Sequence, residues 1–248
     1  MRVVAVIQAR TGSSRLPGKV LMPLLDRSVL EWVIRATRAV QGVDEVVVAT
    51  TIESGDDPII EVCEALGVRS VRGSVEDVLS RFLLAVSDDG VGEADAILRV
   101  TSDCPLMDPV VANMVVAAWR ADPTLDHVST VTPRCMPRGL DAEVASVVAL
   151  RTLDRTLGAD LAHHRTHVTS YLYNNPDSFR VASLNLLPDA SDLRVTLDTP
   201  QDWELIQRVA EILGDDVPSW RRIVEVLRTD PDLTAINADV QQKALTEG

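Results

Sequence analysis

The sequence of 248 residues lacks long hydrophobic runs, paired cysteines and an excess of positive charge. No apolar stretch approaches the ~20 residues of a membrane span, and the N-terminus does not resemble a signal peptide, so we expect a cytoplasmic protein without a membrane partner. The cysteines Cys63, Cys104 and Cys135 are too scattered for a disulfide framework or a zinc site. Acidic residues outnumber basic ones by 37 to 24, which argues against a nucleic-acid partner.

Three cations nevertheless cluster near the N-terminus of this chain, whose net charge is −13. Residues 3–8 form a continuous apolar run, typical of a central parallel strand, and a loop over 9–19 follows directly. The loop contains two glycines and the three cations: Gly12, Gly18, Arg10, Arg15 and Lys19. Because glycine and serine let a backbone approach an anion closely, the loop is predicted to bind a polyphosphate. A basic surface turn is the alternative, and the spacing matches neither the Walker loop nor the dinucleotide-binding fingerprint.

Apolar residues alternate between strand and helix periodicity along the chain. The pattern predicts strands at 3–8, 44–50, 68–72, 95–101 and 194–198, and helices at 28–40, 57–66, 75–87, 200–213 and 218–228. Such an alternation favours a single domain, 1–248, with a three-layer α/β/α fold and a doubly wound, mainly parallel sheet. A small β-hairpin insertion is expected at about 126–148, and a C-terminal helical tail at 215–248.

Two aspartates each follow a predicted strand. Asp103 comes after A-I-L-R-V-T-S, and Asp198 comes after R-V-T-L. Open α/β sheets bind ligands at the carboxyl ends of their strands, and Mg²⁺ takes a few carboxylate oxygens together with phosphate oxygens and water. Both residues are therefore predicted to bind Mg²⁺. Each could instead cap a helix, because a proline follows two residues later.

Six stretches, which together span residues 1 to about 210, resemble a known enzyme family. They are A-R-T-G-S-S-R-L-P-G-K (9–19), V-R-G-S-V-E-D-V-L-S-R-F (71–82), R-V-T-S-D-C-P-L-M-D-P (99–109), M-P-R-G-L-D-A-E-V (136–144), H-V-T-S-Y-L-Y (167–173) and R-V-T-L-D-T-P-Q-D-W-E-L-I (194–206). In this order they are similar to the cytidylyltransferases that make CMP-activated sugar acids, the CMP-KDO and CMP-sialic acid synthetases. The branch named spore coat polysaccharide biosynthesis protein F is more similar still.

The resemblance implies a nucleotide-diphospho-sugar transferase-like fold and a Mg²⁺-dependent enzyme. The enzyme would transfer CMP from CTP to a small anionic acceptor, a sugar acid or a related phosphate or phosphonate, and release pyrophosphate. A homodimer is expected, with the hairpin at 126–148 as a lid or dimer contact. The catalytic residues would be Arg10, Lys19, Asp103 and Asp198, and the two aspartates would bind Mg²⁺. Nucleotide contacts would come from Ala9, Arg10, Thr11, Gly12, Ser13, Ser14, Arg15, Lys19, Arg72, Ser74 and Asp103.

The acceptor is expected near the turn R-G-L-D-A-E (138–143) and a histidine-rich segment further along. By resemblance, its contacts would be Arg138, Asp141 and His167. From the residues alone, the acidic turn is equally compatible with a solvent-facing stripe, in which alternate positions share one side. The family commonly has glutamate where this chain has Thr166, and His163 and His164 do not belong to the motif.

Two other classes of function remain open from the sequence. A metal-dependent glycosyltransferase can use the same fold and a carboxylate–metal site to hold a nucleotide sugar, although it would not need the basic loop. A catalytically silent nucleotide-binding module is less compatible with the presence of both strand-end aspartates. Arg72 and Ser74 are weaker nucleotide candidates than the loop, because Ser74 and Asp77 also fit a capping box. Fold analogy alone does not decide between these classes.

Overall fold

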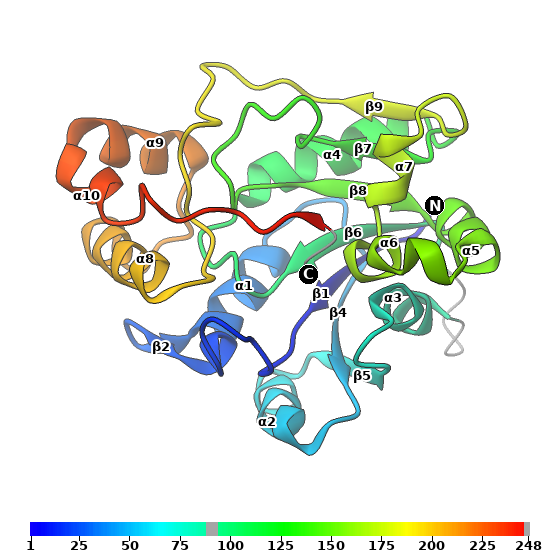
Figure 1. Cartoon of the computed structure of the whole chain (residues 1–248), viewed down its shortest axis with the longest axis horizontal. Coiled ribbons are helices and arrows are strands. Elements are labelled where there is room, and N and C mark those ends of the chain that lie inside the picture. Colours follow the sequence, from blue (N-terminus) through cyan, green and yellow to red (C-terminus); the bar gives the residue numbers. More distant parts are fainter. Residues whose placement is uncertain (88–93, 246–248) are drawn as a thin grey trace.

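The computed structural model describes residues 1–87 and 94–245, and its centre is a sheet in the order β5-β4-β1-β6-β8-β7-β9 (Figure 1). The strands are β1 (Val3–Gln8), β4 (Glu45–Thr51), β5 (Arg69–Gly73), β6 (Ala96–Thr101), β7 (His127–Ser129), β8 (Glu143–Ser146) and β9 (Val181–Ser183). Neighbouring strands are parallel except at β8, which runs antiparallel to β6 and β7. The short strands β2 (Pro23–Leu24) and β3 (Arg27–Ser28) form a separate antiparallel pair. The predicted mainly parallel sheet is confirmed.

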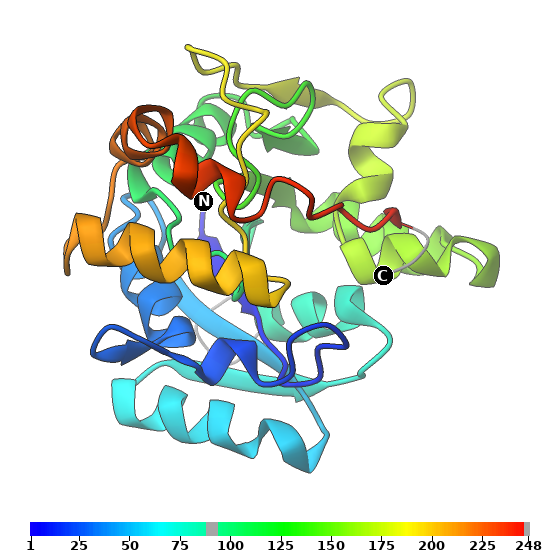
Figure 2. The same cartoon turned by 60° about the vertical axis from the view of Figure 1, so that its left-hand side comes forward.

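Helices cover both faces of the sheet (Figures 1 and 2). In β1, Val3, Ala5 and Ile7 join one apolar cluster while Val4 and Val6 join the other, because successive side chains of a strand point to opposite faces. The first cluster includes residues of α1 (Val29–Arg38), α2 (Asp57–Leu66), α4 (Pro109–Ala121), α8 (Pro200–Leu213), α9 (Trp220–Thr229) and α10 (Pro231–Ala235), and the second includes residues of α3 (Val78–Val86), α5 (Val147–Thr156) and α7 (Ser170–Asn174). The three-layer prediction is therefore confirmed. In the described part of the chain, no helix has the length and apolar character needed to cross a membrane.

Two helices have the boundaries that their end signals predicted. α2 ends where Gly67 adopts a left-handed backbone with φ of 59°, and α8 begins at Pro200 behind its N-cap Thr199. The hydroxyl of Thr199 accepts a hydrogen bond from the N–H of Asp202, whose carboxylate accepts one from the N–H of Thr199. Local signals suffice here, because glycine has no steric penalty in the left-handed region and proline needs no N–H partner in the first turn.

The helix predicted over 75–87 begins later, at Val78. Ser74 does not cap it, because the Ser74 hydroxyl accepts from the N–H of Asp77 at 3.1 Å. The carboxylate of Asp77 in turn accepts from the N–H of Ser80 at 3.0 Å and so caps α3. Ser74 and Asp77 therefore build the turn before the helix, and the prediction of a capping box at this pair is wrong.

The predicted hairpin at 126–148 exists as the antiparallel pair β7 and β8, and both strands belong to the main sheet. β8 continues the sheet by pairing with β6, and Val128 and Val144 are fully buried in the core. The connection between the two strands carries Arg138 and Asp141. Its role as a lid or dimer contact stays a prediction.

The strand predicted at 194–198 is not formed. Arg194 makes one isolated bridge to Arg138, and the rest of the segment is extended without a place in the sheet. Three backbone hydrogen bonds fix the segment instead: Arg138 N–H to Leu193 O (2.9 Å), Val195 N–H to Arg138 O (2.7 Å) and Leu197 N–H to Asp103 O (2.8 Å). The last of these bonds brings Asp198 next to Asp103.

Gly139 permits this close approach of two backbones. Its φ is 102°, and a Cβ atom at this position would lie 2.6 Å from the backbone nitrogen of Thr196. Any larger residue would therefore have to push the extended segment away from the connection before β8.

Replacing this glycine should cost more stability than replacing a glycine with positive φ alone. We expect Gly139→Ala to lower the free energy of unfolding by about 3 kcal/mol, because backbone strain and a backbone clash combine. The matched control is Gly67→Ala, where φ is 59° and no atom lies within 4 Å of the added Cβ. Gly67→Ala should lower the free energy of unfolding by about 1 kcal/mol. Urea unfolding of both variants measures the difference, and equal losses would contradict the packing argument.

Candidate functional site

A cavity of about 580 Å³ opens at the carboxyl ends of β1 and β6. The chain passes from β1 to β4 and β5 on one side of the sheet and returns to β6 on the other, so the cavity lies where the strand order reverses. Open α/β sheets bind ligands at this point, and the volume suits a small molecule. Its walls include the loop over 9–19, the residues after β6, the connection before β8 and the end of the extended segment.

The residues that line the cavity carry more positive than negative charge. The seven cations are Arg10, Arg15, Lys19, Arg81, Arg99, Arg138 and Lys243, and the four carboxylates are Asp103, Asp141, Glu143 and Asp198. This excess of three positive charges lies in a chain whose net charge is −13. A concave surface with such a charge excess attracts anionic ligands.

Lys19 joins the two strand-end aspartates. Its ammonium nitrogen lies 2.8 Å from Asp103 Oδ2, 2.8 Å from Asp198 Oδ1 and 2.6 Å from the carbonyl oxygen of Leu197. An ammonium group has three N–H donors, so all of them are used within the protein. Burial alone would lower the pKa of Lys19, but the two carboxylates outweigh it and raise the pKa. The structure thus brings the basic loop and both aspartates to one point.

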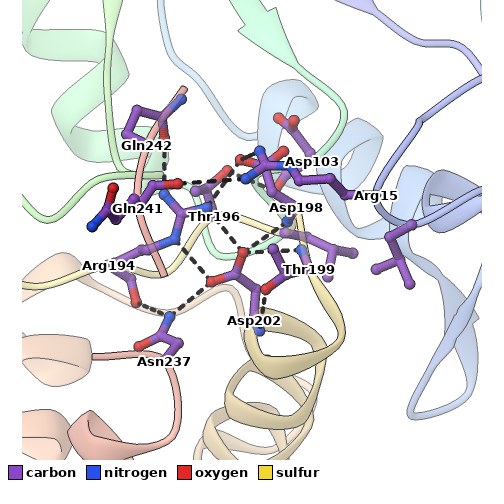
Figure 3. Close-up of polar contacts among 12 residues, drawn as sticks. Arg15, Asp103, Arg194, Thr196, Asp198, Thr199, Asp202, Asn237, Gln241 and Gln242 are labelled. Atoms are coloured by element: carbon purple, nitrogen blue, oxygen red, sulfur yellow. Dashed lines mark hydrogen bonds and ion pairs between the residues drawn. The ribbon is translucent and has the colours of Figure 1, made fainter. Parts of the chain in front are cut away.

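Asp198 is surrounded by three cations (Figure 3). Besides Lys19, Arg15 lies 3.1 Å and Arg194 lies 2.9 Å from Asp198 Oδ2. Arg194 is held by Asp202, a buried residue of α8 whose carboxylate oxygens accept from it at 2.8 and 2.9 Å. Burial would raise the pKa of Asp198, but Lys19, then Arg15 and Arg194, hold it below its ordinary value.

Neither strand-end aspartate caps a helix. α4 is capped by Asp108 and α8 by Thr199, so Asp103 and Asp198 keep their carboxylates for the cavity. Asp202 is a supporting residue that the sequence pattern did not reveal. The stretch T-P-Q-D does indicate a capping box, but nothing local indicates the ion pair of Asp202 with an arginine from the preceding segment.

Asp103 and Asp198 are also the residues that can hold a divalent cation. Within the ranges that the structure describes, no group of three or more histidine, cysteine or acidic side chains could bind a metal ion. Mg²⁺ commonly takes only one or two carboxylates and completes its shell with phosphate oxygens and water. Because both carboxylates reach one ammonium nitrogen at 2.8 Å, their oxygens can face a single small cation. The donor set therefore fits Mg²⁺ that binds together with a phosphate ligand.

Three guanidinium groups line the cavity without a side-chain partner in the described part of the chain: Arg10, Arg81 and Arg138. Arg81 is only 2% exposed, and its Nε and Nη1 atoms are buried without a hydrogen bond. Burial lowers the pKa of Arg81, and the nearby charge of Arg10 lowers it further. A buried polar group without a partner is costly, which indicates that an anion belongs beside Arg81.

Arg81 could have been singled out from the sequence. It lies three positions after Val78 and one before Phe82, on the buried face of α3. An arginine on an apolar helix face is rarely buried without a function or a partner. The motif V-L-S-R-F contained the residue, but no role was predicted for it.

The predicted loop residues divide into cavity walls and an anchor. Ala9, Gly12, Ser13 and Ser14 line the cavity. Thr11 does not, because its N–H and hydroxyl both donate to Asp56 Oδ1 at 2.7 Å. Burial would raise the pKa of Asp56, but hydrogen bonds from Thr11, Thr51 and Thr50 lower it. Thr11 therefore ties the loop to the residues after β4.

Two predicted nucleotide contacts lie away from the cavity. The guanidinium of Arg72 donates to Thr51 O at 2.8 Å, to Glu53 O at 2.7 Å and to Asp57 Oδ1 at 2.7 Å. It thus ties the end of β5 to the turn after β4. Ser74 holds the turn before α3, as described above. The position of both side chains gives no support to a nucleotide-binding role.

The acidic residues of the predicted acceptor turn both line the cavity. Asp141 forms an ion pair with Arg134, but burial dominates and raises the pKa of Asp141. Glu143 is only 4% exposed and accepts from Arg99 at 2.7 Å and from Thr169 at 2.7 Å. Burial would raise the pKa of Glu143, but Arg99, His127 and Thr169 lower it to about 2.

His167 lines the cavity as predicted, beside a strained turn. Val168 has φ of 57° and ψ of −60°, and the N–H of Thr169 donates to the carbonyl of His167 at 2.6 Å. A β-branched residue in this backbone region is strained, and such strain gathers at functional sites. Here the turn directs His167 to the cavity and Thr169 to Glu143. His164 instead bonds Ser170 at 2.7 Å.

Comparisons with known proteins agree with this geometry. A family model described as Cytidylyltransferase matches residues 4–219. The spore coat polysaccharide biosynthesis protein SpsF of Bacillus subtilis is 31% identical over 239 residues, which cover 93% of this chain and 95% of that protein. A cytidylyltransferase structure from Leptospira borgpetersenii superimposes with a TM-score of 0.89 at 28% identity, covering 98% of this chain and 100% of that one.

More distant structures show the same fold. CMP:2-keto-3-deoxy-manno-octonic acid synthetase complexed with CTP has a TM-score of 0.67 at 18% identity, over 86% of this chain and 100% of that one. A Mycobacterium tuberculosis protein in complex with manganese has a TM-score of 0.57 at 16% identity, over 84% of this chain and 99% of that one. At such low sequence identity, structural similarity shows a shared fold only.

Replacement of Glu143 should change how stability depends on pH. The folded-state pKa of about 2 lies below the ordinary value of 4.5, so this carboxylate stabilises the fold above pH 4.5 and loses that effect as the pH falls toward 2. The free energy of unfolding of Glu143→Gln should be lower than that of the wild type at neutral pH. The difference between the two free energies should decrease by on the order of 3 kcal/mol when the carboxylate of the wild type is fully protonated in acid.

Urea unfolding between neutral pH and pH 3 measures about 2 kcal/mol of this change, because pH 3 still lies above the folded-state pKa of about 2. The control is Glu204→Gln, which changes an exposed carboxylate of α8 paired with Arg208. A constant gap between the wild type and Glu143→Gln at every pH would contradict the argument.

Proposed function

This chain belongs to the cytidylyltransferase family of nucleotidyltransferase enzymes, and from that premise we propose that it transfers CMP from CTP to an anionic acceptor and releases pyrophosphate. The single observation that carries the proposal is the ion cluster of Lys19, Asp103 and Asp198 in a cavity with unpaired guanidinium groups. CTP as the donor is supported by the family.

The triphosphate would lie against the basic loop. Arg10 and Arg81 have no counter-ion in the described residues, so both are available to phosphate oxygens. Lys19 has no free donor and acts differently, because it holds the two aspartates together. The close approach of the backbone at Gly12 and Ser13 would allow phosphate oxygens near the loop.

The reaction forms a bond between an acceptor oxygen and the α-phosphorus and breaks the bond from that phosphorus to the bridging oxygen, so that pyrophosphate leaves. Negative charge grows on the transferring group, and fixed cations at the cavity stabilise it. Arg10 and Arg15 would serve this role from the loop. Asp103 and Asp198 would hold Mg²⁺, which when bound supplies Lewis-acid polarisation of a phosphate oxygen.

The acceptor would bind on the side of the cavity formed by the connection before β8. Arg138 has a half-buried guanidinium without a partner in the described residues, which favours a carboxylate, phosphate or phosphonate on the acceptor. Asp141 and His167 line the same cavity and would contact hydroxyl groups of the acceptor beside their present partners, Arg134 and the carbonyl of Leu245. A sugar acid or a related phosphate or phosphonate satisfies both requirements. A homodimer stays a prediction.

A pyrophosphate-release assay tests the donor and the reaction together. The protein is incubated with Mg²⁺ and each of the four ribonucleoside triphosphates, with and without sugar acids and alditol phosphates. We expect release only with CTP and an acceptor. Pyrophosphate release with a different triphosphate, or hydrolysis at a rate that does not depend on the acceptor, would contradict the proposed function.

Removing one metal-binding carboxylate should stop turnover without unfolding the protein. We expect Asp103→Asn to lower the rate of pyrophosphate release at least ~10²-fold, because the site loses half of its charge toward a divalent cation while the side chain keeps its size. The control is Asp192→Asn, which removes a surface carboxylate paired with Arg228 outside this cavity. Near-normal release by Asp103→Asn, with an unchanged circular dichroism spectrum, would refute the assignment.

A further inference from the structure

The segment after α10 crosses the cavity. Residues 237–245, here called the C-terminal strap, run from α10 toward α6 (Figure 1) and contact the loop of residues 9–19 through Arg15 and Ser14. Gln242, Lys243 and Ala244 line the cavity. The sequence predicted a C-terminal helical tail at 215–248 but gave no functional motif in this segment.

Hydrogen bonds hold the strap at both ends. At its start, Asn237 donates to Asp202 Oδ1 at 2.9 Å and to the carbonyl of Arg194 at 3.3 Å (Figure 3). At its far end, the carbonyl of Leu245 lies 3.1 Å from Nε2 of His167. The strap therefore bridges the metal-binding side of the cavity and the histidine on the acceptor side.

The middle of the strap contacts the basic loop and its supports. The side-chain oxygen of Gln242 accepts from Arg194 at 2.8 Å, and the carbonyl of Gln241 accepts from Arg15 at 3.5 Å. Both arginines also contact Asp198. Gln242 thus helps to fix the arginine that holds one of the two aspartates.

Lys243 lies directly over the phosphate-binding part of the loop. Its ammonium nitrogen is 3.5 Å from the hydroxyl of Ser14, and no carboxylate pairs with it in the described ranges. The chain has twenty-two arginines but only two lysines, Lys19 and Lys243, and both line the cavity. Lys19 is buried and forms ion pairs with two carboxylates. Lys243 is exposed, so its ammonium group is available to a ligand.

We propose that the C-terminal strap is a wall of the ligand site and that Lys243, which lies beside Ser14 of the loop, binds the phosphates of the nucleotide. This inference rests on the proposed function, because it takes the ligand to be a nucleoside triphosphate. A polyphosphate bound in the cavity against the loop and the strap would give Arg10, Arg81 and Lys243 a shared counter-ion. The tail is then part of binding and not a passive surface segment.

The first test measures CTP binding with Mg²⁺ by isothermal titration calorimetry on the full chain. Lys243→Gln should weaken binding roughly tenfold, and Lys243→Arg should restore most of it, because a charged hydrogen bond to phosphate is lost and regained. The control is Arg222→Gln, which removes an exposed cation of α9 that does not line the cavity. Equal affinity of the wild type and Lys243→Gln would overturn the inference.

The second test uses the scarcity of lysine. Amine acetylation followed by mass spectrometry reports on Lys19, Lys243 and the N-terminal amine, and CTP with Mg²⁺ should slow the acetylation of Lys243 at least fivefold. Unchanged labelling of Lys243 in a protein that binds CTP would overturn the inference and leave the proposed function standing. If the wild type does not bind CTP at all, the proposed function fails. Binding of inorganic triphosphate that depends on Lys243 would then still support an anion site under the strap.

Discussion

The ammonium of Lys19 is the point on which the site depends. It lies 2.8 Å from the carboxylates of Asp103 and Asp198, which come from the end of a central strand and from a distant extended segment. Without a cation between them, two buried carboxylates would repel each other and move apart. Such a cluster contributes little net stability after desolvation, but it fixes the relative position of three chain segments. Any ligand of the cavity meets groups that are already in place.

Acidic residues support this arrangement throughout the cavity. Asp56 holds the start of the basic loop through Thr11, and Asp202 holds Arg194 against Asp198. Each of these two carboxylates is buried or nearly so and accepts several hydrogen bonds. Some of the acidic residues of this chain therefore serve to hold the basic residues of the site in place. Among the cations that line the cavity, Arg10, Arg81, Arg138 and Lys243 have no carboxylate bonded to them in the described ranges. The division between supported and free cations is what gives an acidic protein a local anion site.

The sequence patterns predicted the strand and helix boundaries that depend on residues close together in the chain. The apolar run of β1, the end of α2 at Gly67 and the start of α8 at Pro200 each follow from adjacent residues. Tertiary contacts decided the fate of the expected strand at 194–198, which became a segment held against Gly139. The later start of α3 is local, because the turn of Ser74 and Asp77 precedes the helix. Among the candidate site residues, the loop and Asp103 could be singled out because each follows a strand, and Asp198 because it follows a segment with the sequence pattern of a strand. Arg81, Asp202 and Lys243 were missed. The apolar face of α3 could have indicated Arg81, whereas no local pattern indicates the ion pair of Asp202 or the contact of Lys243 with Ser14.

Because the C-terminal strap is synthesised last, the contacts that it makes with the cavity form late. Arg15 donates to the carbonyl of Gln241, and the two residues are 226 positions apart. A nascent chain on the ribosome therefore displays the basic loop of residues 9–19 long before the residues of the strap that contact it exist. Contacts between such remote segments are among the last to form, because a very large loop of chain must close first. The enclosed pocket is thus a property of the finished polypeptide, and a partly synthesised chain would present these cations uncovered to the nucleotides around it.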